Sequence, residues 1–260
     1  MTNPAPDWDA ATDSRFRGLR LRPAIDLLMR VPDLPPGDVV DFGCGNGVVA
    51  PALATRFPGR ALVGLDGSPA MLAEARASGL YARLHQADAT TWTPDTPPAL
   101  IFSNALCHWL PDHETLFARL AHSLAPGGTL AVQMPRQFDA PSHALMRSLA
   151  ENMFPDRFDY TRWVAPVADP RDYHRMLSAL GTLDVWETEY IQRLDPAYPD
   201  HPVRRFTEST GLRPIAEKLT EAERAAFIAE YESALTAAYP VEEDGGVLFP
   251  FRRLFFVLTR

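Results

Sequence analysis

The chain has 260 residues, of which 46% are hydrophobic and 22% are charged, and these proportions exclude a disordered or repetitive chain and favour a packed, water-soluble protein. Its net charge of −8 argues against a general binder of nucleic acid or of anionic membranes, because such proteins need a basic surface. No stretch approaches about 18 uninterrupted apolar residues, and aspartates occupy the start of the chain where a secretory signal would be basic and then apolar. We therefore expect a cytoplasmic protein without a membrane span.

The first half of the chain alternates helical and strand-like segments. A helical spacing of apolar residues over 17–31 predicts a helix, so residues 1–36 are expected to form an N-terminal helix and cap. In residues 37–135, helix starts such as Ser68 followed by Pro69 separate short apolar strands. The predicted strands are residues 38–42, 61–65, 82–85, 99–102 and 129–134, and the predicted helices are residues 48–57, 70–77 and 112–124. Strands that alternate with helices indicate a parallel, doubly wound α/β sheet.

After Pro135 this alternation ends. Residues 136–260 are expected to add lid helices and the last strands, giving a mostly parallel sheet of seven strands. The predicted helices are residues 142–152, 171–180, 202–208 and 221–239, and the predicted strands are residues 184–194 and 253–258. Open α/β sheets bind ligands at the carboxyl ends of their strands, where we expect the lid. No repeat or flexible linker divides the chain, so residues 1–260 are expected to form a single domain.

Cysteine and histidine usage argues against disulfides and metal sites. Cys44 and Cys107 lie far apart without a CxxC motif, which suits a reducing compartment, and we expect both to be packing residues. The histidines show no metal-ligand spacing with acids or cysteines, so no metal is expected. A monomer without nucleic-acid or membrane partners is favoured.

The turn after the first strand has the composition of a ligand-binding loop. Gly43, Gly45 and Gly47 lie at alternate positions between a strand and a helix, so a ligand can approach the backbone closely. Asp66 follows 19 residues after Gly47, where an acid can accept both hydroxyls of a ribose. An adenosine-containing ligand is therefore predicted, with a structural glycine loop as the alternative. Asp41, two residues before the first glycine, would repel a pyrophosphate but suits a ligand that carries an ammonium group.

These motifs resemble those of the class I S-adenosylmethionine-dependent methyltransferases. The resemblance rests on DFGCGNG at 41–47, GLDGSPAML at 64–72, QADATTW at 86–92 and PGG at 126–128. Within that family, later segments are similar to the trans-aconitate 2-methyltransferases, so that the resemblance covers nearly the whole chain. Those segments are residues 103–120, 130–135, 140–147, 210–214 and 248–255. The resemblance implies a Rossmann-like fold and S-adenosyl-L-methionine as the cofactor.

The resemblance also implies which residues bind each part of the cofactor. The methionine part would contact Asp41, Gly43, Cys44 and Gly45, the ribose would contact Asp66 and Gly67, and the adenine would contact Asp88 and Ala89. Ser103 and Asn104, after the fourth strand, would face the transferring methyl group and the methionine backbone. For Asp88, a cap within the loop is the alternative.

A carboxylate acceptor would simplify the chemistry. Its reference pKa lies near 4, so it is ionised at pH 7 and methyl transfer needs no general base. Alignment of the reactants and exclusion of water then supply the catalysis, together worth about 7 to 11 kcal/mol. Arginine forks suit a substrate with several carboxylates. The candidates are Arg20, Arg22, Arg213 and either Arg252 or Arg253 before the last strand, with a solvated surface arginine as the alternative for each.

His108 and Trp109 follow the fourth strand at the expected edge of the site. His108 replaces a glutamine of the family and is predicted to bind the substrate carboxylate, to act as a base for a hydroxyl or amine, or to be structural. Trp109 is predicted to be a core residue or a pocket wall. The chain also departs from the family pattern at Asp13, Phe206 and Arg136-Gln137. Asp13 would repel a tricarboxylate in the pocket, whereas Arg136 would attract one.

Four functions remain open at this point. The first is an enzyme that forms a monomethyl ester of trans-aconitate or a related polycarboxylate, with arginines converging beside Asn104. The second methylates another small acceptor, such as a different carboxylic acid or a hydroxylated metabolite, and predicts an active His108 and a solvent-facing Arg22. The third is a cofactor-binding module without catalysis. A nicotinamide dehydrogenase is a weaker fourth, because the glycine spacing it needs is missing.

Overall fold

The computed structural model describes residues 17–208 and 211–260, and within this range it describes side chains from residue 21 onward. The chain divides into two compact units. The first unit runs to Pro135 and adds Val167–Glu187 and Arg253–Arg260, and the second unit comprises Arg136–Pro166 and Thr188–Arg252. The expectation of a single domain, and with it the expectation that the later helices form a lid, stays a prediction.

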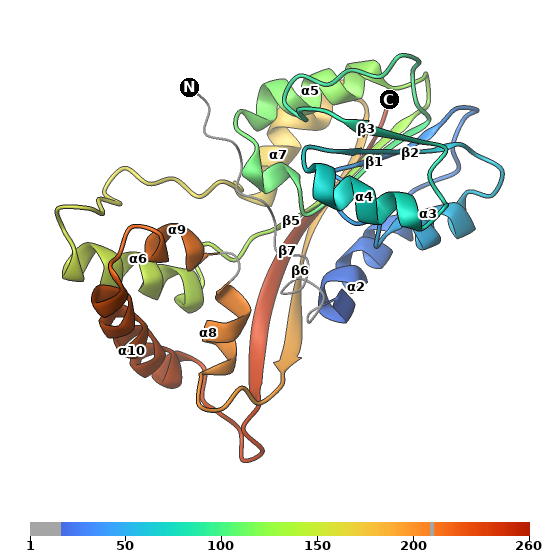
Figure 1. The fold of residues 1–260 in the computed structure, drawn as a ribbon. Helices are drawn as coiled ribbons and strands as arrows, with labels where there is room; N and C mark the ends of the chain where they lie inside the picture. Colours follow the sequence, from blue (N-terminus) through green and yellow to red (C-terminus); the bar gives the residue numbers. More distant parts are fainter. Residues whose placement is uncertain (1–16, 209–210) are drawn as a thin grey trace. The chain divides into compact units, whose positions relative to one another are not determined.

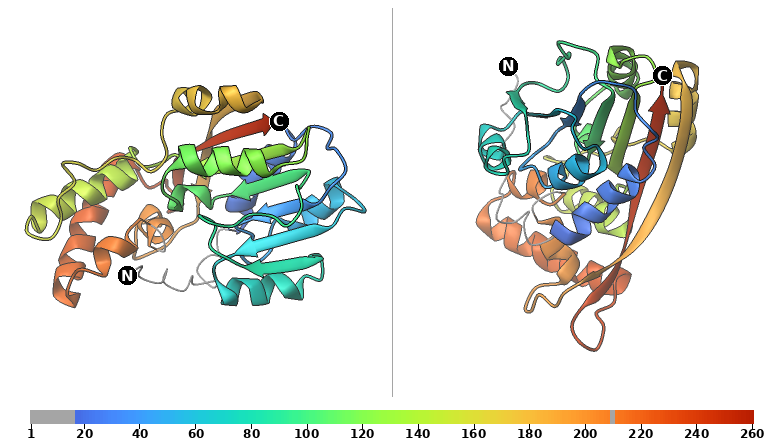
Figure 2. Two further views of the ribbon diagram at one scale, coloured as in Figure 1. Left: turned by 90° about the horizontal axis from the view of Figure 1, so that it is seen from above. Right: turned by 90° about the vertical axis from the view of Figure 1, so that its right-hand side faces the viewer.

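A seven-stranded sheet organises the first unit, in the order β3-β2-β1-β4-β5-β7-β6 (Figure 1). The strands are β1 (Val39–Phe42), β2 (Leu62–Asp66), β3 (Arg83–Gln86), β4 (Leu100–Asn104), β5 (Thr129–Pro135), β6 (Thr182–Leu194) and β7 (Val247–Thr259). The pairs among β1 to β5 are parallel, whereas β7 runs antiparallel to β5. The predicted doubly wound, mostly parallel sheet is confirmed, and Figure 2 gives two further views of it.

Most predicted helices are present with ends that differ by a few residues. They are α2 (Arg17–Leu28), α3 (Ala50–Arg56), α4 (Pro69–Ala77), α5 (His113–Ser123), α6 (Pro141–Met153), α7 (Pro170–Leu177), α8 (Pro202–Thr207), α9 (Arg213–Ala216) and α10 (Glu221–Ala238), with single 3₁₀ turns η1 (Cys107–Trp109) and η2 (Ser178–Leu180). Proline opens several of them because its fixed φ suits the first helical turn. The predicted cap is confirmed at α4, where Ser68 Oγ accepts a hydrogen bond from Met71 N at 3.3 Å.

The last strand is longer than predicted. β7 begins at Val247, not at residue 253, because alternate residues such as Phe249 and Phe251 are buried on one face. Pro250 within this stretch obscures the strand pattern, since proline cannot donate to a sheet ladder. Arg252 and Arg253 therefore lie inside a strand and not before it, and only Arg253 is buried.

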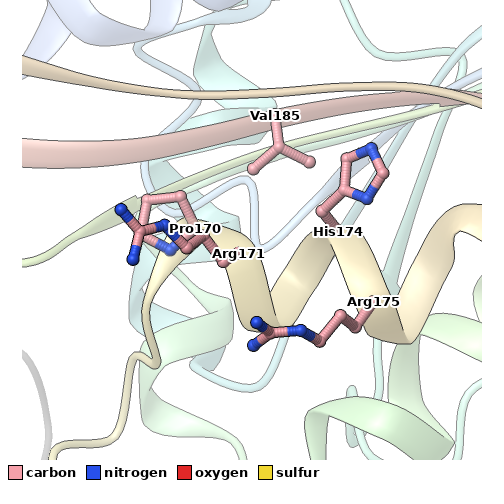
Figure 3. A pocket seen from close by; sticks show the side chains of 5 residues that line it. All are labelled: Pro170, Arg171, His174, Arg175 and Val185. Atoms are coloured by element: carbon pink, nitrogen blue, oxygen red, sulfur yellow. The ribbon is translucent and has the colours of Figure 1, made fainter.

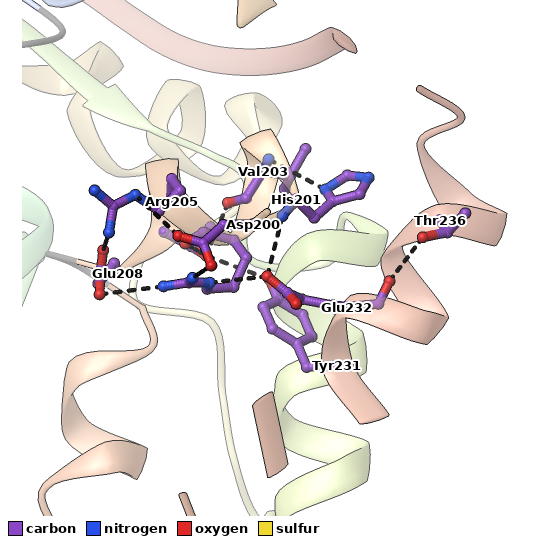
Figure 4. Close-up of polar contacts among 10 residues, drawn as sticks. Asp200, His201, Val203, Arg205, Glu208, Tyr231, Glu232 and Thr236 are labelled. Atoms are coloured by element: carbon purple, nitrogen blue, oxygen red, sulfur yellow. Dashed lines mark hydrogen bonds and ion pairs between the residues drawn. The ribbon is translucent and has the colours of Figure 1, made fainter. Parts of the chain in front are cut away.

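The helices of the second unit enclose their own polar network. The guanidinium of Arg204 on α8 is 8% exposed and pairs with Asp200, with Glu208 at 3.2 Å and with Glu232 of α10 at 3.0 Å. These three carboxylates gather at α8 in Figure 4. Three carboxylates around one buried guanidinium satisfy its donors, so this arginine has a structural role in the second unit.

Several expected properties can be compared with the described residues. Both cysteines are free and buried, which confirms them as packing residues. In residues 17–208 and 211–260, no helix is long and apolar enough to cross a membrane. The same ranges hold no group of three or more histidine, cysteine or acidic residues placed to bind a metal ion.

Candidate cofactor and acceptor site

The glycine turn after β1 leaves one open approach to the backbone. Gly43 N and Cys44 N donate to Leu65 O at 2.8 and 2.9 Å, which fastens the turn to β2. A Cβ at Gly43 would lie 2.6 Å from the Leu106 side chain, so this glycine allows the loop after β4 to pack there. Gly45 has φ of +53° and a Cβ there would meet nothing within 4 Å, so this glycine leaves free space for a ligand. The Cys44 side chain is buried beside Leu72, so only its backbone can face a ligand.

Asp66 connects the glycine turn to the start of α4. Its Oδ2 accepts from Gly45 N at 2.9 Å, and its Oδ1 accepts from Ser68 N at 2.8 Å. The residue ends β2, as predicted, and its side chain is half-buried. Each carboxylate oxygen has a second lone pair, so Asp66 can hold the turn and still accept hydroxyl donors from a ligand.

Asp41 is a buried carboxylate with another carboxylate nearby. It is 2% exposed, and burial raises its pKa to about 7, with the charge of Asp66 adding to the effect. Tyr81 opposes the rise, because its hydroxyl donates to Asp41 Oδ2 at 2.7 Å. Two carboxylates at one turn attract a cation, and a cation in turn stabilises the ionised form of Asp41. The turn therefore fits a ligand with ammonium and sulfonium groups.

Tyr81 is a site residue that the sequence motifs do not reveal. Its ring lies 2.9 Å from where a Cβ of Gly64 would stand and 3.1 Å from that of Gly47. These two glycines give the ring room to reach Asp41. Tyr81 lies between α4 and β3, outside the quoted motifs, and no spacing rule connects it with Asp41.

The loop after β3 is held by its own polar contacts. Asp88 Oδ1 accepts from Thr90 N at 2.8 Å and from Thr90 Oγ1 at 2.7 Å, and these bonds lower the pKa of this exposed carboxyl. Arg119 of α5 donates to Ala89 O at 2.9 Å and to Trp92 O. The cap within the loop, the alternative for Asp88, is thus present. A role for Asp88 and Ala89 at an adenine stays a prediction.

Two polar side chains at the end of β4 point to opposite faces. Ser103 Oγ donates to Phe42 O at 3.0 Å and is fully buried, so this hydroxyl fastens β4 to β1. Asn104 is half-buried, and its buried Oδ1 accepts no hydrogen bond from the described part of the chain. The next residue, Ala105, has φ of +57° and turns the backbone sharply. Asn104 is therefore the residue of this pair that has an amide atom available to a ligand.

A second polar group lies along β5 and β7. Gln133 is fully buried and pairs in register with Asn104 on β4, while Arg253 pairs with Pro135. Arg253 is 5% exposed. The burial of His108 lowers the pKa of its imidazole to about 3, and the charge of Arg253 adds to the effect. His108 is consequently neutral at pH 7, and the positive charge at this part of the edge belongs to Arg253.

Comparisons with known proteins agree with this geometry. The model of a family described as "Methyltransferase domain" matches residues 15–186. The chain belongs to this methyltransferase family. Its relatives include proteins named trans-aconitate 2-methyltransferase, from Methylobacterium nodulans at 46% identity over 98% of both chains and from Rhizobium meliloti at 42% identity over 97% of this chain and 98% of the relative.

Solved methyltransferase-like structures share the fold at low sequence identity. The Bacillus halodurans protein BH2331 aligns with a TM-score of 0.57 at 15% identity, covering 91% of this chain and 97% of the other. YcgJ from Bacillus subtilis aligns with a TM-score of 0.54 at 15% identity, covering 95% and 98%. The chain thus has the class I methyltransferase fold, and S-adenosylmethionine is the methyl donor of this family. The carboxylates of Asp41 and Asp66 fit that cation.

The candidate arginines of this methyltransferase are divided between the two units. In the first unit the Arg22 side chain is 71% exposed and lies 4.0 Å from Asp26, whereas for Arg20 only the helical backbone is described. In the second unit Arg213 Nε lies 2.8 Å from Glu217, and Arg252 lines a cavity of about 410 Å³. The predicted convergence of these arginines beside Asn104 stays untested, and Arg253 is the candidate that the first unit itself buries near Asn104.

Other predicted residues have clearer outcomes. Trp109 is 54% exposed, so its prediction as a core residue is wrong, whereas the alternative of a pocket wall stays a prediction; its ring lies beside the His108 ring, with centroids 4.6 Å apart. Phe206 is a packing residue, with its ring 5.3 Å from Phe249. Arg136 N donates to Arg252 O at 2.9 Å. Asp13 lies outside the described residues.

A separate basic hollow occurs on α7 and β6. Its volume is about 320 Å³, and Pro170, Arg171, His174, Arg175 and Val185 line it (Figure 3). Arg175 is already paired with Asp172 at 2.7 Å. None of the residues predicted to bind cofactor or acceptor lines this hollow.

Proposed function

We propose that this protein transfers the methyl group of S-adenosylmethionine to a carboxylate of trans-aconitate and forms a monomethyl ester. The observation that carries the proposal is the extent of the identity with the proteins of that name, at 46% over 98% of both chains. That extent includes the second unit as well as the cofactor-binding part. An identity limited to the cofactor motifs would support methyl transfer without pointing to an acceptor.

We assign the cofactor to the carboxyl ends of β1, β2 and β3. The carboxylates of Asp41 and Asp66 would hold its positive groups and its ribose, with the backbone of Gly45 beside them. Asp88 and Ala89 would bind the adenine. When bound, the cofactor supplies an electrophilic methyl group. Asn104, with an unused amide oxygen, would then lie at the transfer site.

The state of His108 favours a carboxylate acceptor over a hydroxyl or amine. A general base works best when its pKa lies near the operating pH, and the pKa of His108 is lowered to about 3. Such a histidine is a poor base at pH 7. A carboxylate is already ionised there and needs none, so the chain has only to bind and align it and to exclude water.

One observation favours the second candidate, methylation of a different small acceptor. That candidate predicts a solvent-facing Arg22, and the Arg22 side chain is 71% exposed. The two candidates therefore differ in the acceptor and agree on the cofactor.

The test is an S-adenosylhomocysteine release assay with the purified protein and a panel of acceptors. The panel contains trans-aconitate, cis-aconitate, citrate, itaconate and several monocarboxylic acids, and mass spectrometry identifies the products. We expect the highest kcat/KM with trans-aconitate and the gain of one methyl group. A higher kcat/KM with a monocarboxylic or hydroxylated acceptor would replace the proposal by the second candidate.

A further inference from the structure

The side chain of Gln133 is a buried amide that the fold does not use. It is fully buried, and neither Oε1 nor Nε2 has a hydrogen-bond partner within residues 17–208 and 211–260. Buried polar groups are almost always paired, because an unpaired group loses its contacts with water without replacement. An amide that is retained without internal partners is therefore a candidate for binding a ligand.

A neighbouring glutamine shows the ordinary arrangement. Gln137 is 2% exposed, its Nε2 donates to Pro250 O at 2.7 Å, and its Oε1 accepts from Arg252 N at 2.9 Å. Both of its amide groups thus fasten the chain after β5 to β7. Gln133 and Gln137 are the same residue type, four positions apart and equally hidden from water, yet only Gln137 has a structural task.

Strand register places Gln133 between two other polar residues. Gln133 pairs with Asn104 on β4 and with Phe255 on β7, and Arg253 pairs with Pro135, two residues further along β5. Paired residues, and residues two apart in a strand, share one face of a sheet. Asn104, Gln133 and Arg253 therefore occupy the same face of three adjacent strands, at the carboxyl ends of β4 and β5. We call these three residues the polar row.

On this face an aromatic pair and a buried positive charge both lie along β7, beside Gln133. Phe255 pairs with Gln133 and stacks on Trp186, with ring centroids 5.0 Å apart. Arg253 lies two residues before Phe255 and is buried, and the burial of His108 together with the charge of Arg253 lowers the pKa of that histidine and keeps its imidazole neutral. An amide N–H and a guanidinium in a dry setting are suited to bind a carboxylate.

We propose that Gln133 Nε2 and the guanidinium of Arg253 bind a carboxylate of the acceptor other than the one that is methylated. The inference rests on the proposed function and assigns residues that would distinguish its polycarboxylic acceptor from a monocarboxylic acid. The reacting carboxylate has to offer its lone pair to the methyl carbon, and a guanidinium fork would withdraw that electron density. Within the polar row, Gln133 and Arg253 therefore bind the carboxylate that does not react, so an acceptor needs a second carboxylate. The reacting carboxylate then lies beside Asn104.

The test compares Gln133→Met with the matched control Gln137→Met. Methionine fills a similar volume without a polar atom, so Gln133→Met is expected to leave Tm unchanged or raise it, whereas Gln137→Met breaks two hydrogen bonds and lowers Tm. For Gln133→Met, the ratio of kcat/KM for trans-aconitate to that for a monocarboxylic acid is expected to fall about 10- to 100-fold, mainly through KM. Arg253→Lys keeps the charge without the fork and is expected to lower the same ratio by a smaller factor.

Two outcomes would overturn the subsite. An unchanged ratio in Gln133→Met would show that Gln133 does not bind the acceptor, and a fall in Tm as large as that of Gln137→Met would make Gln133 a structural residue. Calorimetry with trans-aconitate, citrate and tricarballylate distinguishes a failure of the subsite from a failure of the proposed function. If the wild type binds one of these acids without methylating trans-aconitate, and Gln133→Met loses that binding, the subsite stands and the acceptor changes. If the wild type binds none of them, the subsite is wrong.

Discussion

The carboxyl edge of the sheet carries opposite charges at its two halves. The ends of β1 and β2 present two carboxylates, Asp41 and Asp66, whereas the ends of β4 and β5, with the middle of β7 beside them, present two amides and the buried guanidinium of Arg253. A sulfonium donor and a carboxylate acceptor need surroundings of this opposite kind, side by side. The protein as a whole has a net charge of −8, so the proposed anionic acceptor would have to be attracted by the local placement of an arginine and not by net charge.

The first prediction concerns the two buried arginines, Arg204 and Arg253, and has the largest expected effect. Arg204 is surrounded by the carboxylates of Asp200, Glu208 and Glu232, so its charge is balanced within the fold. Arg204→Met would leave these carboxylates without their partner and is expected to lower the free energy of unfolding by about 3 kcal/mol. Chemical denaturation of the wild type and of the Arg204→Met protein measures this change in the free energy of unfolding.

Arg205→Met serves as its control, because Arg205 is 35% exposed and its pairs with Asp200 and Glu208 are screened by water. The control is expected to lose about 0 to 1 kcal/mol. Equal losses in the two variants would show that burial does not set the strength of this network. We have proposed that Arg253 binds the acceptor, and Arg253→Lys is expected to affect acceptor kinetics more than stability.

The next prediction concerns the negative half of the edge. Asp41→Asn keeps the shape and an oxygen that can accept from Tyr81, but it removes the charge that attracts the cofactor. The affinity for S-adenosylmethionine is expected to fall by about 2 kcal/mol, roughly 30-fold, when one partner of a desolvated charge pair is removed. Isothermal titration calorimetry gives the dissociation constants directly.

Asp41→Asn is expected not to lower the free energy of unfolding of the ligand-free protein, because a buried carboxylate with a raised pKa destabilises that protein when it is ionised. Gln133→Met is the matched variant on the other half and should leave cofactor affinity intact. If both variants weakened cofactor binding equally, the division of the edge into a donor half and an acceptor half would be wrong.

A pH profile tests the same half without a mutation. The pKa of Asp41 is raised to about 7 in the ligand-free protein, and the cation binds the ionised form more tightly. Affinity for S-adenosylmethionine should therefore be constant above pH 7 and fall about tenfold per pH unit below it, with a proton released on binding. The sign for stability is opposite: this group makes the ligand-free protein less stable as the pH rises from about 4, its unfolded value, to about 7.

Calorimetry in buffers of different ionisation enthalpy measures the released proton, and the Asp41→Asn protein should lack both effects. A profile that is flat between pH 6 and 8 in the wild type would place the relevant ionisation elsewhere.

The two halves also differ in how far the sequence reveals them. Asp41, Gly43, Gly45 and Asp66 stand in two short motifs, where glycine spacing and a strand-ending acid restrict the possible structures, and the turn has the predicted form. Even here the sequence does not show that the Cys44 side chain is buried in the core or that a Cβ at Gly43 would meet Leu106, so the predicted contacts of these two residues with a cofactor can involve only their backbone.

The acceptor half has no comparable motif. Gln133 and Arg253 are 120 positions apart and become neighbours only through the antiparallel register of β7 on β5, which periodicity within one segment cannot predict. The early start of β7 was hidden by Pro250, and the exposure of Trp109 depends on the direction in which η1 leaves β4. The sequence thus fails to reveal residues whose positions depend on the register between distant strands or on the direction of an irregular turn.

Tyr81 belongs to the negative half of the edge, yet the sequence motifs do not reveal it. The last prediction concerns this residue and has the smallest expected effect. Its hydroxyl donates to Asp41 Oδ2 at 2.7 Å and favours the charged carboxylate, so Tyr81→Phe should raise the pKa of Asp41 further. Cofactor affinity at pH 7 is expected to fall by about 1 kcal/mol, roughly fivefold, and the fall should vanish above about pH 9, where Asp41 is ionised in either protein. The measurement is the midpoint of the affinity profile in the two proteins. A loss that persists equally at high pH would mean that the Tyr81 ring shapes the turn by packing over Gly47 and Gly64, and that its hydroxyl does not control the charge of Asp41.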